Sequence, residues 1–355
     1  MGIVNRKTAI GLTSVAAGGF ALSRFLNYHP RAVQEEECRN EGGAANLRAG
    51  QSIKIVTYNT QFFAGTGYHF FYDGGRDTLV DPADVQKTVA AIAAFLKQEN
   101  PDFVLLQEVD CEARRTGYLD QIDLLNNSLP ADLRNHVATF YWKSRFVPHP
   151  KVMGRAGTKL TIFSRYRLSR ATRYQLPSTP GIPVVKDFDF KRAILEVEIP
   201  LTNGGIFCLL NTHLEAFPKG TDVMARQVDR VLTQLDSLDQ KGVPWIIGGD
   251  FNLLPPGQWV RLDLQEKGCH REPSEISALY ERYEGVPALS SASGERMRDF
   301  MTFTKRIEGD RVPIRTLDYF FTSPKVKIKE YAVRQASVKH LSDHLPLVAE
   351  FVLAG

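Results

Sequence analysis

The sequence predicts an α/β domain built from two packed β-sheets that are covered by helices. From Ile53 onward, strand patterns alternate with helical patterns, and the strands outnumber the helices. The same region shows no internal repeat and no second linker, so residues 53–355 are expected to form one domain. The 355 residues, 43% hydrophobic and 24% charged, have the composition of a globular protein, which excludes a disordered chain.

The first elements of this domain carry clear local signals. Ile53–Asn59 is predicted to be a strand from its β-branched residues. Asp81–Asn100 is predicted to be a helix, because Asp81 can cap its N-terminus and Pro82 suits the first helical position. Phe103–Val109 is a continuous apolar run with a polar ending, as expected for a buried strand. The later predicted elements are strands at Leu160–Ser164, Ala193–Ile199, Ile206–Thr212, Trp245–Gly249, Thr316–Thr322 and Leu347–Leu353, and an amphipathic helix at Asp222–Leu238.

The N-terminal segment differs in composition from the rest of the chain. Arg6 and Lys7 precede the uncharged stretch Thr8–Leu22, and no acidic residue occurs before Glu35. This layout is typical of a secretory signal peptide. An uncleaved membrane anchor, an organellar transit peptide and a disordered tail are the alternatives. Residues 1–33 are therefore expected to direct a secreted or periplasmic protein or to anchor it in a membrane, and residues 34–52 to form a polar linker.

The cysteines give no sign of a metal centre. The chain has four, widely spaced and without a CxxC pair: Cys38, Cys111, Cys208 and Cys269. This spacing indicates neither a zinc site nor a dense disulfide framework, although an even number leaves room for a bridge in an exported protein.

Six short segments place a carboxylate, an amide or an imidazole beside a predicted strand. They are TYNTQ at Thr57–Gln61, LLQEVD at Leu105–Asp110, NTHLEA at Asn211–Ala216, GGDFN at Gly248–Asn252, LDYFF at Leu317–Phe321 and SDHLP at Ser342–Pro346. Each segment alone is ordinary, since single strand-end acids and histidines commonly cap the chain or face solvent. Together they predict metal-assisted phosphoester hydrolysis, which must neutralise the phosphate, activate a water and stabilise the departing oxygen.

Two of these segments offer oxygen ligands, and a third offers groups for the water and the phosphate. Glu108 is the leading candidate ligand for Mg²⁺, and Asn59 either orients that carboxylate or reaches the ion through its amide oxygen. Asp250 and Asn252 follow an apolar strand two positions apart, so both can aim into one cleft. There the acid can position water while the amide donates to a phosphate oxygen.

The other segments supply imidazoles. Asp343 and His344 are adjacent, so one can face the metal while the other reaches the phosphate. Asp318 can hold the imidazole of His344 in a fixed tautomer. His213 is a second imidazole at a strand end.

With these residues the sequence resembles the endonuclease/exonuclease/phosphatase superfamily. These metal-dependent phosphoesterases include DNase I-like nucleases, abasic-site endonucleases, inositol-polyphosphate 5-phosphatases and neutral sphingomyelinases. The resemblance spans Ile53–Leu353 and keeps the motifs in the family's order. It implies a four-layer α/β sandwich, in which two mixed sheets pack face to face between helices and the site lies at one end.

The resemblance also implies roles for single residues. Three positions match the family's metal site: Asn59, Glu108 and Asp343. Five match the groups that act on water, phosphate or the catalytic histidine: Asp250, Asn252, Asp318, His344 and His213. His213 fits the NTH variant of the DNase I-like and sphingomyelinase-like branches, which disfavours a strict DNA-repair role. Arg192 lies where several members keep a basic group near the substrate.

A basic stretch bears on the substrate. Residues 133–186 contain no Asp or Glu and eleven basic residues, although the whole chain carries only +4. If part of this stretch shares one face, it creates a positive field for nucleic acid, a phosphoinositide or an anionic membrane surface. The alternative is that these cations pair with distant acids or lie on different faces.

An aromatic insert follows the strand that carries Asn59. Tyr68, His69, Phe70, Phe71 and Tyr72 are consecutive and are flanked by glycines. Such a loop can stack on bases or dip into a lipid interface, and it can equally be a buried cap over the sheet end.

These observations predict a Mg²⁺-dependent phosphoester hydrolase, with Mn²⁺ as a substitute metal and a lipid head group of the sphingomyelinase type as the preferred substrate. An exported nuclease is the second hypothesis. A catalytically silent binding module with the same fold is a third, of a different class. The predicted partners are a phospholipid or nucleic acid and an anionic membrane surface, and no protein partner is predictable.

Overall fold

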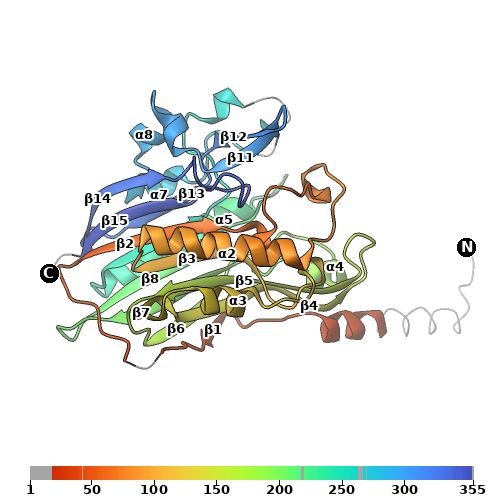
Figure 1. The fold of residues 1–355 in the computed structure, drawn as a ribbon, viewed down its shortest axis with the longest axis horizontal. Coiled ribbons are helices and arrows are strands. Elements are labelled where there is room, and N and C mark those ends of the chain that lie inside the picture. Colours follow the sequence, from red (N-terminus) through yellow and green to blue (C-terminus); the bar gives the residue numbers. More distant parts are fainter. Residues whose placement is uncertain (1–17, 42, 217–219, 263–266, 269, 354–355) are drawn as a thin grey trace, which may run out of the picture.

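Two β-sheets form the centre of the molecule (Figure 1). The computed structural model describes residues 18–41, 43–216, 220–262, 267–268 and 270–353. Most of the predicted signal peptide or anchor thus lies outside the described residues. Residues 18–26 form a helix. Among the described helices, none is both long and apolar enough to cross a bilayer.

The larger sheet has seven strands. Their spatial order is β1 (Val33–Glu36), β6 (Arg170–Gln175), β7 (Ala193–Pro200), β8 (Ile206–His213), β9 (Trp245–Asp250), β13 (Asp318–Thr322) and β10 (Glu284–Val286). Strands β8 and β9 are parallel, and the other pairs are antiparallel. The sheet is therefore mixed, as the resemblance implied.

The second sheet has six strands. Their order is β14 (Val326–Val333), β15 (Leu347–Leu353), β2 (Ser52–Asn59), β3 (Phe103–Asp110), β5 (Gly154–Ser164) and β4 (Asn135–Val147). Only β2 and β3 pair in parallel. A separate hairpin consists of β11 (Phe303–Ile307) and β12 (Asp310–Arg315).

Helices cover the outer faces of both sheets. The α-helices of the described residues include α2 (Pro82–Glu99), α3 (Gln121–Ser128), α4 (Pro183–Phe188), α5 (Val223–Gln240), α7 (Ser277–Tyr280) and α8 (Leu289–Ser293). Short 3-10 helices lie at Gln61–Phe63, Phe71–Asp73, Arg114–Thr116, Ala131–Leu133, Trp259–Arg261 and Met297–Phe300. Asp81 caps α2 as predicted, because its side chain accepts a hydrogen bond from the Ala83 N–H.

Three apolar clusters define four layers. One cluster lies between the sheets and contains residues such as Ile55 and Leu105 of one sheet and Leu209 of the other. A second joins the outer face of the six-stranded sheet to α2 and α3, and a third joins the outer face of the seven-stranded sheet to α5. This confirms the predicted four-layer α/β sandwich.

The segment expected to be a linker, 34–52, is part of the fold, so that expectation was wrong. Val33–Glu36 pairs with β6 at the edge of the larger sheet, and Leu47 is fully buried between the sheets. The glutamates suggested a solvated linker, but they occur on an edge strand, where charged side chains can stay in water.

Candidate active site

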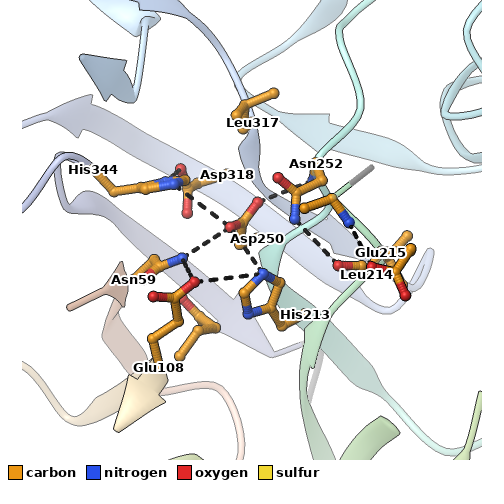
Figure 2. Close-up of polar contacts among 12 residues, drawn as sticks. Asn59, Glu108, His213, Leu214, Glu215, Asp250, Asn252, Leu317, Asp318 and His344 are labelled. Carbon is orange, nitrogen blue, oxygen red and sulfur yellow. Dashed lines mark hydrogen bonds and ion pairs between the residues drawn. The ribbon is translucent and has the colours of Figure 1, made fainter. Parts of the chain in front are cut away.

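The predicted site residues meet at one end of the sandwich because side chains alternate between the two faces of each strand. Along β2, β3, β8 and β9, alternate residues enter the cluster between the sheets. Continuing that alternation to the strand ends places Asn59, His213 and Asp250 on the same inner side. Asp318 begins β13, and His344 immediately precedes the loop into β15. Figure 2 shows these side chains converging.

Asp250 lies at the centre of the site. The register sets it opposite His213 of β8 and opposite Asp318 of β13. Its Oδ2 lies 3.3 Å from His213 Nε2 and 3.6 Å from His344 Nε2. Gly249 permits this approach, because at its φ of 145° a Cβ would lie 2.0 Å from the Thr212 carbonyl oxygen.

The protonation of Asp250 and His213 follows from their burial. Burial, opposed by His344, raises the pKa of Asp250 to about 6. Burial and the nearby Arg192 lower the pKa of His213 well below its ordinary value, so that this imidazole is neutral at pH 7. A neutral His213 can donate from Nε2 to the carboxylate, and its Nδ1 has no hydrogen-bond partner among the described residues.

His344 is held by Asp318, as predicted. His344 Nδ1 lies 2.8 Å from Asp318 Oδ2, and both side chains are buried. Burial disfavours the imidazolium, but the carboxylates of Asp318 and Asp250 outweigh it and raise the pKa of His344 to about 10. The Nε2 atom of His344 therefore presents a proton toward Asp250 and the site.

Glu108 lies at a β-bulge. The register between β3 and β5 shifts between Leu106 and Val109, and Glu108 has a left-handed φ of 57°. Bulges redirect side chains beside functional sites. Here the Glu108 carboxylate turns toward Asn59, whose Nδ2 donates to Glu108 Oε1 at 3.2 Å and to Asp250 Oδ2 at 3.0 Å. Asn59 Oδ1 accepts from the Gln61 N–H, so the amide orients both acids.

Asn252 and Asp343 lie at the edges of this network. Asn252 has a φ of 52°, its N–H donates to Asp250 Oδ1 at 2.9 Å, and its Nδ2 donates to the Leu214 carbonyl at 3.1 Å. Asp343 is half-buried, with its Oδ1 at 3.2 Å from Ser342 Oγ. Ser342 Oγ also lies 2.8 Å from the Asn59 carbonyl oxygen, which fixes the Asp343 loop against the end of β2.

A cavity of about 590 Å³ opens from this network. Glu108 and Arg192 line it at the catalytic side, and its walls are largely aromatic, including Phe70, Phe71, Trp142 and Phe190. The aromatic insert is thus both a cap and a cavity wall, since Phe70 is buried against Phe62 while Tyr72 is partly exposed.

Arg192 is buried beside the cavity without a close acidic partner. Its side chain is 5% exposed, and its nearest carboxylate oxygen, Glu215 Oε1, is 3.9 Å away. The guanidinium lies over the rings of Tyr141 and Phe190, and its Nε and Nη1 have no hydrogen-bond partner among the described residues. Such a buried cation is suited to bind an anion.

The sequence comparison decides the family. A model of the endonuclease/exonuclease/phosphatase family matches residues 56–344, more than half of the chain. The chain belongs to the endonuclease/exonuclease/phosphatase family. It is accordingly a metal-dependent phosphoesterase, and the hypothesis of a catalytically silent module is set aside. A search of curated proteins gives no significant match.

Solved structures with the same fold are similar at low sequence identity. An endonuclease/exonuclease/phosphatase from Beutenbergia cavernae has a TM-score of 0.57 and 21% identity, covering 86% of this chain and 72% of that chain. The human Nocturnin catalytic domain with bound sulfate has a TM-score of 0.54 and 19% identity, covering 90% and 97%. A mannosyl-6-phosphatase from Bacteroides thetaiotaomicron has a TM-score of 0.50 and 18% identity, covering 85% and 100%. At these identities, the likenesses establish the fold alone.

The donor set of this family member fits a hard divalent cation. The carboxylates of Glu108 and Asp250 both approach the same Asn59 amide, and burial raises the pKa of each. A buried acid and a half-buried acid that share this amide favour a compensating positive charge. Among the described residues, ligand atoms of Asp250, Asp318 and His344 also lie within 4.8 Å of one another. Because His344 and Asp318 already share a hydrogen bond, Glu108 is the better placed of these acids to hold the metal.

Two side chains beside or beneath the site, those of Arg115 and Gln107, were not among the predicted site residues. Arg115 lines the cavity while both its Nε and Nη2 lie 2.8 Å from the Asp110 carboxylate, and its guanidinium stacks 3.7 Å from the centre of the Phe62 ring. Gln107 Nε2 donates to Asn211 Oδ1 at 2.7 Å and so ties the two sheets together beneath the site. The segments LLQEVD and NTHLEA contained Gln107 and Asn211, but only the sheet packing shows that they meet.

Proposed function

We propose that this chain is a Mg²⁺-dependent phosphodiesterase that acts on the head group of a phospholipid. The observation that carries the proposal is the aromatic cavity that begins at Glu108 and Arg192. A phosphodiester bound with its phosphate between these two residues can place an apolar group in that cavity, where burial of apolar surface stabilises the complex. When bound at Glu108, Mg²⁺ supplies charge neutralisation and Lewis-acid activation of the phosphate.

Asp250 is the proposed base. Its pKa of about 6 leaves it mostly ionised at pH 7 and close to the operating pH, as suits a general base. Hydrogen bonds from Asn59 Nδ2 and the Asn252 N–H fix the orientation of its carboxylate, and His213 Nε2 lies 3.3 Å from its Oδ2. It can therefore orient a water molecule and accept a proton from it.

His344 and Arg192 are the proposed cationic groups on the phosphate. Asp318 holds His344 in the protonated state, so that Nε2 can donate to a phosphate oxygen as charge develops there. Arg192 supplies a guanidinium that the protein itself leaves largely unpaired. Asn252 lies beside Asp250, where one of its amide hydrogens can also face the phosphate.

A nuclease is the second candidate, because the same aromatic walls could stack on a base. Phe71 already stacks on His149 with ring centres 6.1 Å apart. Ion pairing within the basic stretch, residues 133–186, argues against a long polyanion as the substrate, because several of its cations are paired with acids from elsewhere in the chain. These pairs are Arg155 with Glu112, Arg165 with Asp132, and Arg170 with Glu35. Part of the positive charge of this stretch is thus neutralised by acids from outside it.

Parallel assays with the purified full chain separate these substrates. Sphingomyelin vesicles, plasmid DNA and mannose 6-phosphate are each supplied with Mg²⁺, and phosphate or phosphocholine release and plasmid nicking are measured. Phosphocholine release is expected to be the fastest reaction and to have a higher KM in Arg192→Met. Rapid plasmid nicking with intact lipid would overturn the lipid proposal in favour of a nuclease, and selective release of phosphate from the sugar would indicate a phosphomonoesterase.

A further inference from the structure

The helix at residues 18–26 buries the polar Ser23 and exposes several apolar side chains, while Arg24 is also exposed. Ser23 is only 3% exposed, and its Oγ lies 2.7 Å from Asp187 Oδ2. Phe20, Leu22 and Phe25 project to solvent, with Phe25 63% exposed. A helix on a globular protein normally buries the apolar side, so this inversion indicates that an apolar environment meets the outer surface.

Helix α4 repeats the inversion next to it. Asp187 is the buried residue of α4, and it holds the N-terminal helix through Ser23 and Arg24. On the outside of α4, Ile182 and Val185 are 70% and 58% exposed. The buried Asp187 carboxylate therefore holds the two short helices together in an arrangement that leaves their apolar residues exposed to water.

Strand β4 extends this surface. Asn27 pairs with Ser144 of β4, and the guanidinium of Arg145 lies 4.5 Å from the centre of the Phe25 ring. Phe146 is exposed two positions after Ser144. We call the resulting surface the apolar face, and define it by Phe20, Leu22, Phe25, Phe146, Ile182 and Val185. Figure 1 shows its three elements gathered at the same end of the molecule.

The charge around the apolar face is positive. Arg24, Lys143 and Arg145 are exposed on the same elements. The segments 18–31, 143–155 and 181–189 contain only two acids, of which Asp187 is buried and Asp189 half-buried. Apolar residues surrounded by cations complement the interface of an anionic bilayer, which offers acyl chains beneath phosphate and carboxylate groups.

We propose that the apolar face docks the enzyme on an anionic lipid bilayer. Docking orients the catalytic cavity as well, because Val147 of β4 and Phe188 of α4 line that cavity from the same elements that carry the face. A lipid head group could then enter the cavity directly from the surface. The inference rests on the proposed function only in naming the bilayer as the source of the substrate.

Vesicle sedimentation tests the docking. The full-length chain is mixed with vesicles of phosphatidylcholine alone, or of equal parts phosphatidylcholine and phosphatidylserine. The double variant Leu22→Ser/Phe25→Ser is expected to bind the anionic vesicles about tenfold or more weakly, since it removes two large apolar side chains from the interface. Lys143→Ala/Arg145→Ala should weaken that binding by about fivefold for each lost cation while changing binding to phosphatidylcholine little. Ile307→Ser, at an apolar residue of the β11–β12 hairpin that is 44% exposed, is the control and should bind as the wild type does.

Hydrolysis of the soluble ester bis(p-nitrophenyl) phosphate is measured on the same samples. The face variants should keep this activity and lose only activity on vesicles, which supports docking. Equal vesicle binding by the wild type and the face variants would overturn the proposal. It would also be overturned if the wild type is a dimer and the variants lose the dimer but keep vesicle binding. Intact docking without lipid hydrolysis would instead contradict the proposed substrate and leave the docking inference supported.

Discussion

His344 Nδ1 and Asp318 Oδ2 lie 2.8 Å apart, although the two residues come from segments attached to different sheets. Asp318 is the first residue of β13 in the seven-stranded sheet, and His344 lies just before β15 of the six-stranded sheet. The hydrogen bond forms only when the sheets are packed in register. This histidine–aspartate pair is therefore a consequence of the sandwich itself.

Asp318→Asn should lower the pKa of His344. The carboxylate stabilises the imidazolium, so its loss moves the pKa from about 10 toward the ordinary value. If His344 acts protonated, the alkaline limb of the kcat/KM profile then moves to lower pH. The measurement is a pH–rate profile of wild type and variant. An alkaline limb at the same pH in both would show that His344 is not the group that titrates there.

Asp250→Asn should reduce kcat by about 10²-fold or more, in line with the contribution of a general base. The amide is nearly isosteric and can keep the hydrogen bond from the Asn252 N–H, so folding should be unaffected. Single-turnover rates and the melting temperature are both measured. A near-normal rate in a folded variant would remove Asp250 from its proposed role.

Glu108→Gln should raise the Mg²⁺ concentration needed for half-maximal activity by roughly tenfold or more, since metal sites are sensitive even to changes in groups behind their ligands. Asn59→Ala is the matched comparison and should have a smaller effect, because the Asn59 amide orients Glu108. Titration calorimetry with Mg²⁺ gives a readout that does not require turnover. Unchanged metal affinity in Glu108→Gln would exclude this residue as a ligand.

Arg192→Met should raise KM by roughly tenfold or more, the typical loss for a charged hydrogen bond to phosphate. The melting temperature should stay the same or rise, because a buried and poorly paired charge is removed while the packing volume is kept. Arg192→Lys keeps the charge but lacks the planar guanidinium, so its KM should lie between those of the wild type and Arg192→Met. A large fall in melting temperature with unchanged KM would indicate a structural cation instead.

The sequence predicted those parts of the fold whose signals are local. Asp81 and Pro82 marked the start of α2, and apolar runs marked β3 and β9 within a residue or two. The strands that it missed carry mixed signals. In β4, Lys143 and Arg145 interrupt the apolar alternation because one side of the strand faces solvent there, and β1 is a short, glutamate-rich edge.

The site was predictable for a different reason. Strand ends on one side of a sandwich converge, so Asp250 and Asn252 could be assigned to one cleft from their segment, and the resemblance to the family implied that His344 lies there too. The position of Arg115 beside the cavity could not be predicted, because this residue of the short 3-10 helix Arg114–Thr116 is placed by stacking on Phe62 and pairing with Asp110. Such a position depends on contacts that no local pattern records.

Hydrolysis of bis(p-nitrophenyl) phosphate by the wild type and by His344→Ala, with and without Mg²⁺, tests the site most directly. Turnover is expected to require Mg²⁺ and to fall by about 10²-fold or more in the folded variant. Absence of turnover by folded wild-type protein with any divalent metal, or equal turnover in His344→Ala, would contradict this expectation.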